Sequence, residues 1–383
     1  SRDAGLELVA ESSPSVGQFR DADERSSLVL IQSRFPRLTS TGLETGDRRQ
    51  ERAGDSARKS PLSSRTGLTP STHDRANAQA IRGPQEAHYG FFAISNHGAC
   101  KNVTKNLWES SKAFFDLPLE VKSSTPMTED YPYGYEMEER LCARRRTHHG
   151  SVVDSKETFS IGPLSALSGM PFRRFPVGGP ASFETSLNDY YESMEKLAEV
   201  LFRGFALALE LDENWFTCDG RFDRARHQCA LRILNYPHLK FDDSGITIRA
   251  GAHTDYGAFT ILKSGGPGLQ LNLSGDGAKG SWLDVPYLDD DVLIINLGDL
   301  MQRWTNDKWR STLHRVVAES NESERGECES IRRQSIAFFV NMNGDASIET
   351  LGSCMNESNK SRYQPIKASD YLIKRHAQSM GQE

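Results

Sequence analysis

Hydrophobic and polar positions alternate in two different ways along the chain, and the change comes near residue 229. Before it, apolar side chains recur at helical intervals. The longest such stretch contains Leu187, Tyr190, Tyr191, Met194, Leu197, Ala198, Leu201, Phe202, Phe205 and Leu209. It predicts an amphipathic helix whose apolar stripe faces the core. A shorter helix is predicted from Asn102 to Phe115, where Pro118 follows and restricts the residue before it.

Beyond Cys229 the apolar runs are short and separated by turn residues such as Gly265-Gly266-Pro267-Gly268. Eight strands are expected there, at residues 230–235, 247–250, 259–263, 269–273, 282–285, 292–296, 312–318 and 335–341. Two more are expected at 88–94 and 156–162, with an aromatic loop at 131–135 between them. The pattern predicts a mainly β fold with flanking helices, in which a jelly roll (a cupin-like double-stranded β-helix) follows a helical N-terminal region.

The same pattern divides the chain into four parts. Residues 1–85 are rich in Ser, Arg, Gly, Asp and Thr without sustained periodicity, which predicts a mostly disordered or atypical extension. We expect the N-terminal helical region at 86–222, the jelly-roll core at 223–345 and a C-terminal helical tail at 346–383.

Composition narrows the range of partners. A formal net charge of −6 offers no general electrostatic footprint for nucleic acid or an anionic membrane. No apolar run approaches the ~20 residues that a membrane-spanning helix needs. The cysteines show no Cys-X-X-Cys spacing, which favours reduced thiols and a cytoplasmic location: Cys100, Cys142, Cys218, Cys229, Cys328 and Cys354. The pattern leaves the oligomeric state open.

Candidate chemistry begins at His253-Thr254-Asp255, just before the expected strand at 259–263. In extended chain His253 and Asp255 point the same way, and an imidazole beside a carboxylate supplies two ligands of a 2-His-1-carboxylate Fe(II) site. A lone His-X-Asp is weak evidence, because such tripeptides arise by chance. His314, within an alternating strand, is the natural third ligand. His227, His238 and His376 are weaker candidates.

A second candidate cluster involves Arg333 and Ser335, which share a face of the last expected strand. A guanidinium beside a hydroxyl suits a carboxylate, which arginine grips through parallel charge-assisted hydrogen bonds. Tyr236 could supply a third hydrogen bond. Taken alone, Arg333 could equally be a surface residue on an edge strand, and Tyr236 a turn residue before Pro237.

Five motifs in order resemble the Fe(II)/2-oxoglutarate-dependent dioxygenases, in the branch that includes isopenicillin N synthase and plant flavonoid and gibberellin oxidases. They are Leu-Arg-Ile-Leu-Asn-Tyr-Pro (231–237), His-Thr-Asp-Tyr-Gly-Ala-Phe-Thr (253–260), Asn-Leu-Gly-Asp-Leu-Met-Gln-Arg-Trp-Thr-Asn (296–306), Leu-His-Arg-Val-Val (313–317) and Arg-Gln-Ser-Ile-Ala-Phe-Phe (333–339). The resemblance covers residues 86 to 375. It departs from the family in two places: no strand like Ile-Pro-Val-Ile-Asp-Leu precedes His88, and residues 319–331 form a longer polar link.

The resemblance implies that His253, Asp255 and His314 hold Fe(II), and that Arg333, Ser335 and Tyr236 bind 2-oxoglutarate. It implies an enzyme that uses O₂ and decarboxylates 2-oxoglutarate to succinate while it hydroxylates or desaturates a small molecule. Substrate contacts would come from 131–135, 144–149 and the C-terminal helix near Tyr371. Two alternatives are an oxidase like isopenicillin N synthase, which uses no 2-oxoglutarate, and a non-catalytic binding barrel.

Overall fold

The computed structural model describes residues 89–95, 97–137, 156–238, 247–272, 282–288, 291–318, 321–322, 328–329 and 331–379. The predicted disorder of residues 1–85 and the basic run 144–149 therefore lie outside the described residues. None of the helices in the described ranges combines the length and apolarity needed to cross a membrane.

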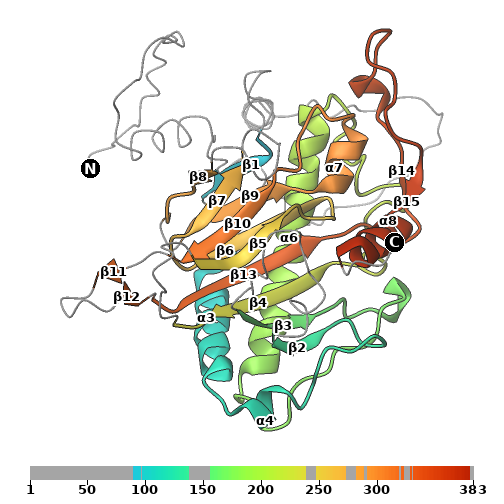
Figure 1. Ribbon diagram of the computed structural model, residues 1–383. Helices are drawn as coiled ribbons and strands as arrows, with labels where there is room; N and C mark the ends of the chain where they lie inside the picture. The colour runs from blue at the N-terminus through green and yellow to red at the C-terminus, as the bar shows by residue number, and fades with distance from the viewer. Residues whose placement is uncertain are drawn as a thin grey trace, which may run out of the picture.

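Two antiparallel sheets form the body of the protein (Figure 1). The larger sheet has the order β1-β9-β6-β13-β4-β3-β2, and the smaller has β5-β10-β7-β8. The strands of these sheets are β1 (Phe91–Ile94), β2 (Gly134–Met137), β3 (Glu157–Ile161), β4 (Ala230–Tyr236), β5 (Thr247–His253), β6 (Phe259–Ser264), β7 (Leu269–Asn272), β8 (Trp282–Asp284), β9 (Leu293–Leu297), β10 (His314–Ala318) and β13 (Arg333–Val340). The two facing sheets confirm the predicted jelly roll.

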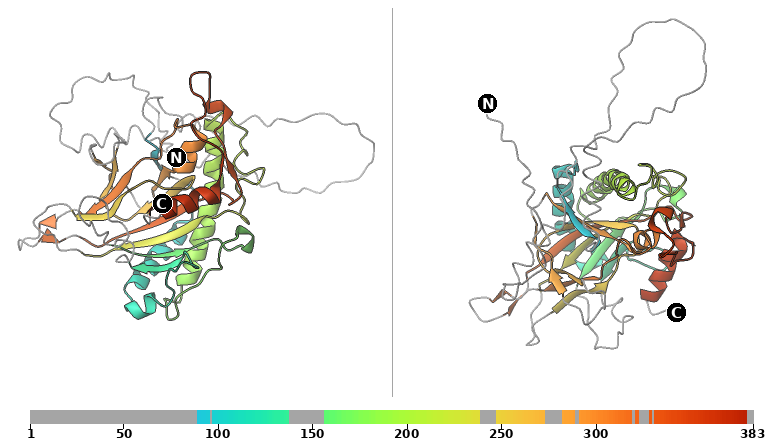
Figure 2. Two further views of the ribbon diagram at one scale, coloured as in Figure 1. Left: turned by 45° about the vertical axis from the view of Figure 1, so that its right-hand side comes forward. Right: turned by 90° about the horizontal axis from the view of Figure 1, so that it is seen from above.

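The helices are α3 (Lys101–Phe115), α4 (Leu119–Lys122), α6 (Phe183–Ala208), α7 (Asp299–Trp304) and α8 (Ala368–Ser379), with 3₁₀ turns η2 (Ala166–Ser168) and η3 (Gly352–Cys354). The long helix α6 and the shorter α3 run side by side over one face of the larger sheet (Figures 1 and 2). The predicted helices are thus confirmed. Strands β1, β2 and β3 come from the predicted helical region but pair into the larger sheet, and the boundaries at 86, 223 and 346 stay predictions.

Two short hairpin-like pairs complete the fold: β11 (Asn321–Glu322) with β12 (Cys328–Glu329), and β14 (Ser347–Ile348) with β15 (Ile366–Lys367). The first pair lies in the long polar link between β10 and β13 and projects away from the sheets (Figure 1). The link therefore lengthens the connection without disturbing the pairing of β10 or β13.

The prediction of an aromatic loop over residues 131–135 is wrong for the second half of that range. Strand β2 begins at Gly134 and pairs with β3. Gly134 has a positive φ of 88°, and a Cβ there would lie 2.4 Å from the carbonyl oxygen of Thr125. Because glycine lacks that atom, the chain passes close enough for the Tyr135 amide to bond Thr125 at 2.7 Å. Helix α7 is not predicted by the hydrophobic pattern of the sequence.

The main apolar core lies between α6 and the outer face of the larger sheet, and its centre is aromatic. The Phe202 ring on α6 packs 5.0 Å from Phe259 on β6, 4.9 Å from Phe222 and 5.1 Å from Phe216. All four side chains are buried. A smaller cluster fills the space between the two sheets, with members from both: Phe91, Tyr236, Ala250, Leu269, Leu271, Ile294 and Val316.

Replacing Phe202 with Ala is expected to lower the free energy of unfolding by about 3–5 kcal/mol, because it removes buried area and leaves a cavity among rings that cannot close over it. Urea denaturation measures the change. Phe172, which is 67% exposed, is the matched control, and Phe172→Ala should change stability by less than about 0.5 kcal/mol. Equal effects at both positions would contradict this account of the core.

Candidate active site

The pairing of β5 with β10 brings two histidines together. His253 is the last residue of β5, His314 is the first of β10, and the two face each other in register. Their ring centroids are 4.3 Å apart. Asp255 follows β5 by two residues, and its Oδ1 lies 3.8 Å from His253 Nε2 and 3.9 Å from His314 Nε2. The structure thus brings the three predicted metal ligands within 4.8 Å of one another.

Both imidazoles are oriented by backbone carbonyls. His253 Nδ1 lies 2.7 Å from the Gly251 oxygen, and His314 Nδ1 lies 3.0 Å from the Thr312 oxygen. A carbonyl can only accept, so each Nδ1 carries the proton and each Nε2 presents its lone pair toward the other two groups. Metal-binding histidines are held in this way in proteins generally.

The carboxylate of Asp255 is fixed by two side chains on neighbouring strands of the larger sheet. Thr260 Oγ1 on β6 and Asn296 Nδ2 on β9 each donate to Oδ2 at 2.5 Å. These bonds occupy one oxygen and leave Oδ1 directed at the histidines. Burial would raise the pKa of Asp255, but the adjacent histidines and these two hydrogen bonds hold the pKa below its ordinary value. The carboxylate is therefore ionised at neutral pH.

The loop that carries Asp255 is also supported from the C-terminal helix. Arg375 on α8 donates to Thr254 Oγ1 at 3.1 Å and to Asp299 Oδ2 at 2.9 Å, and stacks 4.6 Å from the Tyr256 ring. The Asp299 amide in turn donates to the Asp255 carbonyl oxygen at 2.8 Å. Helix α8 thus holds the loop between the two sheets at several points. Tyr371, near which substrate contacts are expected, donates to Asp299 at 3.0 Å.

The second predicted cluster forms around Arg333, the first residue of β13. The residue is 4% exposed, and its guanidinium donates from Nε to the Pro267 carbonyl oxygen at 3.0 Å and from Nη2 to Ser264 Oγ at 2.8 Å. Nη1 is buried without a hydrogen-bond partner, and no carboxylate of the described residues pairs with this arginine. Burial lowers its pKa.

Tyr236 lies beside this guanidinium, and Ser335 lies on the same face of β13. The Tyr236 ring centroid is 5.1 Å from Arg333 Cζ, and the two residues face each other across β4 and β13. Ser335 is two residues along β13 on the same face and is 3% exposed. A buried guanidinium with a free donor and no counter-charge is costly unless an anion joins it. A carboxylate of 2-oxoglutarate fits this need, because it would take the free Nη1 donor.

The sequence did not reveal the residues that hold Asp255, nor a second buried arginine near Tyr236. Thr260 and Asn296 lie in motifs already noticed, but only the sheet pairing shows that both reach Asp255. Arg249 on β5 is a second buried guanidinium near Tyr236, 6.0 Å from the ring centroid, and donates to the carbonyl oxygens of Pro237 and Ile331. Burial and the charge of Arg333 lower the pKa of Arg249. The only signal for Arg249 in the sequence is a basic residue four positions before His253 in an otherwise apolar strand.

The weaker histidine candidates stand apart from the triad. His227 is buried, pairs with Glu195 at 2.7 Å and stacks on Phe222, which indicates a structural role. His376 on α8 packs edge-on against Tyr256. In 131–135, the Tyr131 hydroxyl accepts from the Arg174 amide and the Tyr135 hydroxyl donates to Glu157, so these rings pack within the protein.

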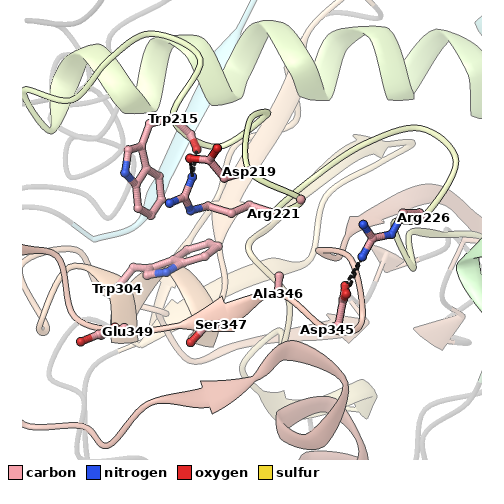
Figure 3. Close-up of a pocket in the computed structure, with 10 residues that line it drawn as sticks. Trp215, Asp219, Arg221, Arg226, Trp304, Asp345, Ala346, Ser347 and Glu349 are labelled. Carbon is pink, nitrogen blue, oxygen red and sulfur yellow. Dashed lines mark hydrogen bonds and ion pairs between the residues drawn. The ribbon is translucent and has the colours of Figure 1, made fainter.

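A pocket of about 410 Å³ lies away from the triad, and Figure 3 shows the residues that line it. Trp215 and Trp304 form one side of it, and Arg221 stacks 4.0 Å from the Trp215 ring while pairing with Asp219. Arg226 pairs with Asp345. Because both arginines already have acidic partners, neither offers an uncompensated positive charge to a ligand in this pocket, unlike Arg333.

Burial and the neighbouring His314 lower the pKa of His253 from 6.5 to about 4. In the metal-free protein, an unfolded histidine therefore takes up a proton between pH 6.5 and 4 that folded His253 does not. We expect the wild type to lose stability relative to His253→Gln as the pH falls through this window, and the difference to be constant above pH 7. Urea denaturation of both proteins from pH 4.5 to 8 measures it. A pH-independent difference would contradict the lowered pKa.

Two family models match the chain. The model of the 2OG-Fe(II) oxygenase superfamily matches residues 227–342, which contain the triad and Arg333. The model of the non-haem dioxygenase in morphine synthesis N-terminal region matches residues 67–177. The second match starts before residue 86, where the sequence resemblance begins.

Curated relatives and solved structures agree with these two family matches. The 2-oxoglutarate-Fe(II) type oxidoreductase hxnY of Emericella nidulans is 30% identical over 330 residues, covering 81% of this chain and 87% of the relative. A full-length Neurospora crassa protein, crystallised with alpha-KG and thymine, is similar with a TM-score of 0.67 and 27% identity, covering 80% of this chain and 91% of that one. A putative 2OG-Fe(II) oxygenase family protein of Caulobacter crescentus gives a TM-score of 0.66 at 26% identity, covering 80% and 94%.

The match extends over most of both chains, includes the jelly roll and its N-terminal region, and spans both candidate clusters. These findings confirm the resemblance read from the sequence, with its Fe(II) and 2-oxoglutarate cofactors, and do not support a non-catalytic barrel. The chain belongs to the 2OG-Fe(II) oxygenase superfamily and is a 2-oxoglutarate- and Fe(II)-dependent dioxygenase.

Proposed function

We propose that this dioxygenase hydroxylates or desaturates a small molecule, with Fe(II) held by His253, Asp255 and His314. The observation that supports the metal site is the convergence of two lone pairs and one free carboxylate oxygen from two distant segments of the chain, 253–255 and 314. Two imidazoles and one carboxylate suit Fe(II) and leave coordination positions open for other ligands. The bound iron and 2-oxoglutarate supply the oxidising chemistry, in which O₂ is consumed and 2-oxoglutarate becomes succinate and CO₂.

The chain's own residues have separate tasks in this proposal. Arg333 binds the distal carboxylate of 2-oxoglutarate through its free Nη1, and Ser335 and Tyr236 lie beside the same carboxylate. Thr260 and Asn296 hold Asp255 so that its free oxygen stays with the histidines. The apolar lining between the sheets, including Leu269, Leu271 and Val316, excludes water from the reacting centre.

A small-molecule substrate is supported by the relatives, one of which is crystallised with thymine, and by a net charge of −6, which offers no general electrostatic footprint for nucleic acid. Membership of the branch that includes isopenicillin N synthase rests on the five sequence motifs. The cytoplasmic location rests on the scattered cysteines, of which Cys100, Cys218, Cys229 and Cys354 are free among the described residues. Oligomeric state stays open.

Replacing Thr260 with Val keeps the side chain's size but removes the hydroxyl that holds Asp255. We expect the affinity for Fe(II) to fall by about 10- to 100-fold, the usual cost of losing a partner that orients a metal ligand. Anaerobic titration with Fe(II), followed by calorimetry, measures it. Thr217→Val removes a hydroxyl that bonds only the Asn214 carbonyl and should leave the affinity unchanged. Unchanged affinity in Thr260→Val would contradict the role of this hydroxyl.

Arg333→Met should raise the KM for 2-oxoglutarate by about 100-fold, because a charge-assisted hydrogen bond to the carboxylate and the positive charge beside it are lost. Release of labelled CO₂ from 2-oxoglutarate measures the change. The adjacent Arg332 is the matched control: it points the other way and pairs with Asp116 and Asn235, so Arg332→Met should keep the wild-type KM. Oxygen consumption that needs no 2-oxoglutarate would favour the isopenicillin N synthase-like oxidase and contradict the proposal.

A further inference from the structure

Ser264, the last residue of β6, lies beside Arg333 on the inner face of the larger sheet. Leu262, two residues earlier on β6, packs into the cluster between the sheets, so Ser264 shares that face. Ser264 Oγ accepts a hydrogen bond from Arg333 Nη2 at 2.8 Å and donates to the Gly266 carbonyl oxygen at 3.0 Å. This buried hydroxyl therefore joins the guanidinium to the turn that follows β6.

The turn from Gly265 to Gly268 is itself held tightly by the rest of the fold. A Cβ on Gly265 would lie 2.2 Å from the Trp108 ring on α3. A Cβ on Gly268, whose φ is 100°, would lie 2.3 Å from the Val317 carbonyl oxygen on β10. The Val317 amide also donates to the Gly268 carbonyl oxygen at 2.8 Å. Because only glycine permits these close approaches, the turn is fixed between α3 and β10.

This turn and Ser264 occupy one edge of the Arg333 guanidinium. Nε lies 3.0 Å from the Pro267 carbonyl oxygen and 3.3 Å from that of Gly266, and Nη2 is bonded to Ser264. Nε and Nη2 form one of the edges with which a guanidinium can grip a carboxylate. Because that edge is taken, a bound carboxylate has to approach the end of the guanidinium that carries the buried, unpartnered Nη1.

The two ends of the proposed 2-oxoglutarate site are thus fixed independently. Thr260 and Asn296 hold the metal ligand Asp255, whereas Ser264 and its turn hold Arg333. A 2-oxo diacid has to span the distance between these two ends. One more methylene would carry its distal carboxylate about 1 Å too far, and in enzyme sites a misplacement of that size can cost about 100-fold in rate.

We propose that Ser264 is a positioning residue that sets the length of the 2-oxo diacid this enzyme accepts. The proposal rests on the proposed function, because it takes Arg333 to bind the distal carboxylate. It goes further by giving Ser264 the task of fixing the guanidinium plane, so that a five-carbon diacid reaches both the metal and Nη1. Without this hydroxyl, Arg333 is held by the turn through Nε alone, and its terminal nitrogens can turn toward a longer diacid.

The test compares two 2-oxo diacids that differ by one methylene, 2-oxoglutarate and 2-oxoadipate. Their binding to the purified full chain loaded with Fe(II) is measured by anaerobic calorimetry. The wild type should bind 2-oxoglutarate at least about 10-fold more tightly than 2-oxoadipate. In Ser264→Ala the affinity for 2-oxoglutarate should fall by about 10-fold, because a hydrogen bond to a charged group is lost, and the affinity for 2-oxoadipate by less than about 3-fold.

Three further variants separate this role of the hydroxyl from an effect on folding. Ser264→Cys keeps the size of the side chain but offers only a weak acceptor, and should lose the preference as Ser264→Ala does. Ser264→Thr retains a hydroxyl and should keep the preference. Ser111→Ala is the matched control: it removes a buried hydroxyl on α3 that donates to the Leu107 carbonyl oxygen, and should bind both diacids as the wild type does. Thermal unfolding shows which variants are folded.

The inference is overturned by a wild type that binds both diacids equally, or by an unchanged preference in whichever of Ser264→Ala and Ser264→Cys is folded. Equal loss of both affinities would make Ser264 merely structural and would also overturn it. The proposed function has its own readout. If the wild type binds neither diacid, or if Arg333→Met binds 2-oxoglutarate as tightly as the wild type, the proposed function fails. If binding requires Arg333 but the preference does not require Ser264, only the role of Ser264 fails.

Discussion

The hydrogen bonds from Thr260 and Asn296 to one oxygen of Asp255 are the constraint on which the site depends. They come from β6 and β9 of the larger sheet, whereas the two histidines come from β5 and β10 of the smaller one. The carboxylate therefore joins the two sheets at a single point, and the metal ligands converge only when both sheets are formed and correctly paired. Helix α8 supports the same loop from outside through Arg375.

The inner face of the jelly roll also concentrates positive charge that the protein itself does not neutralise. Arg333 has a buried donor without a partner, and Arg232 has no acidic partner among the described residues. Such charges lower stability, and the aromatic core between α6 and the outer face of the larger sheet offsets them. In the function proposed above, a carboxylate of 2-oxoglutarate neutralises the charge of Arg333. Protein stability and ligand selection are thus supplied by opposite faces of the same sheet.

The sequence predicted the strands of the core well, because a period of two carries that information locally, and its ordered motifs singled out six candidate site residues. His253, Asp255 and His314 converge as expected, and Arg333, Ser335 and Tyr236 gather on one inner face. It could not predict Thr260 and Asn296 as partners of Asp255, since that depends on the register between β6 and β9. It also missed β2, where the unusual backbone of Gly134 permits a close approach that no propensity reveals.

The most direct test of the account is anaerobic addition of Fe(II) and 2-oxoglutarate to the purified protein, with the visible absorption spectrum recorded. A 2-oxo acid bound directly to iron gives a weak charge-transfer band, and a site built from His253, Asp255, His314 and Arg333 should produce it. The band should disappear in His253→Ala and require far more 2-oxoglutarate in Arg333→Ala. Iron binding without a band in the wild type, or a band that survives the loss of His253, would contradict the assignment of the metal and cofactor sites.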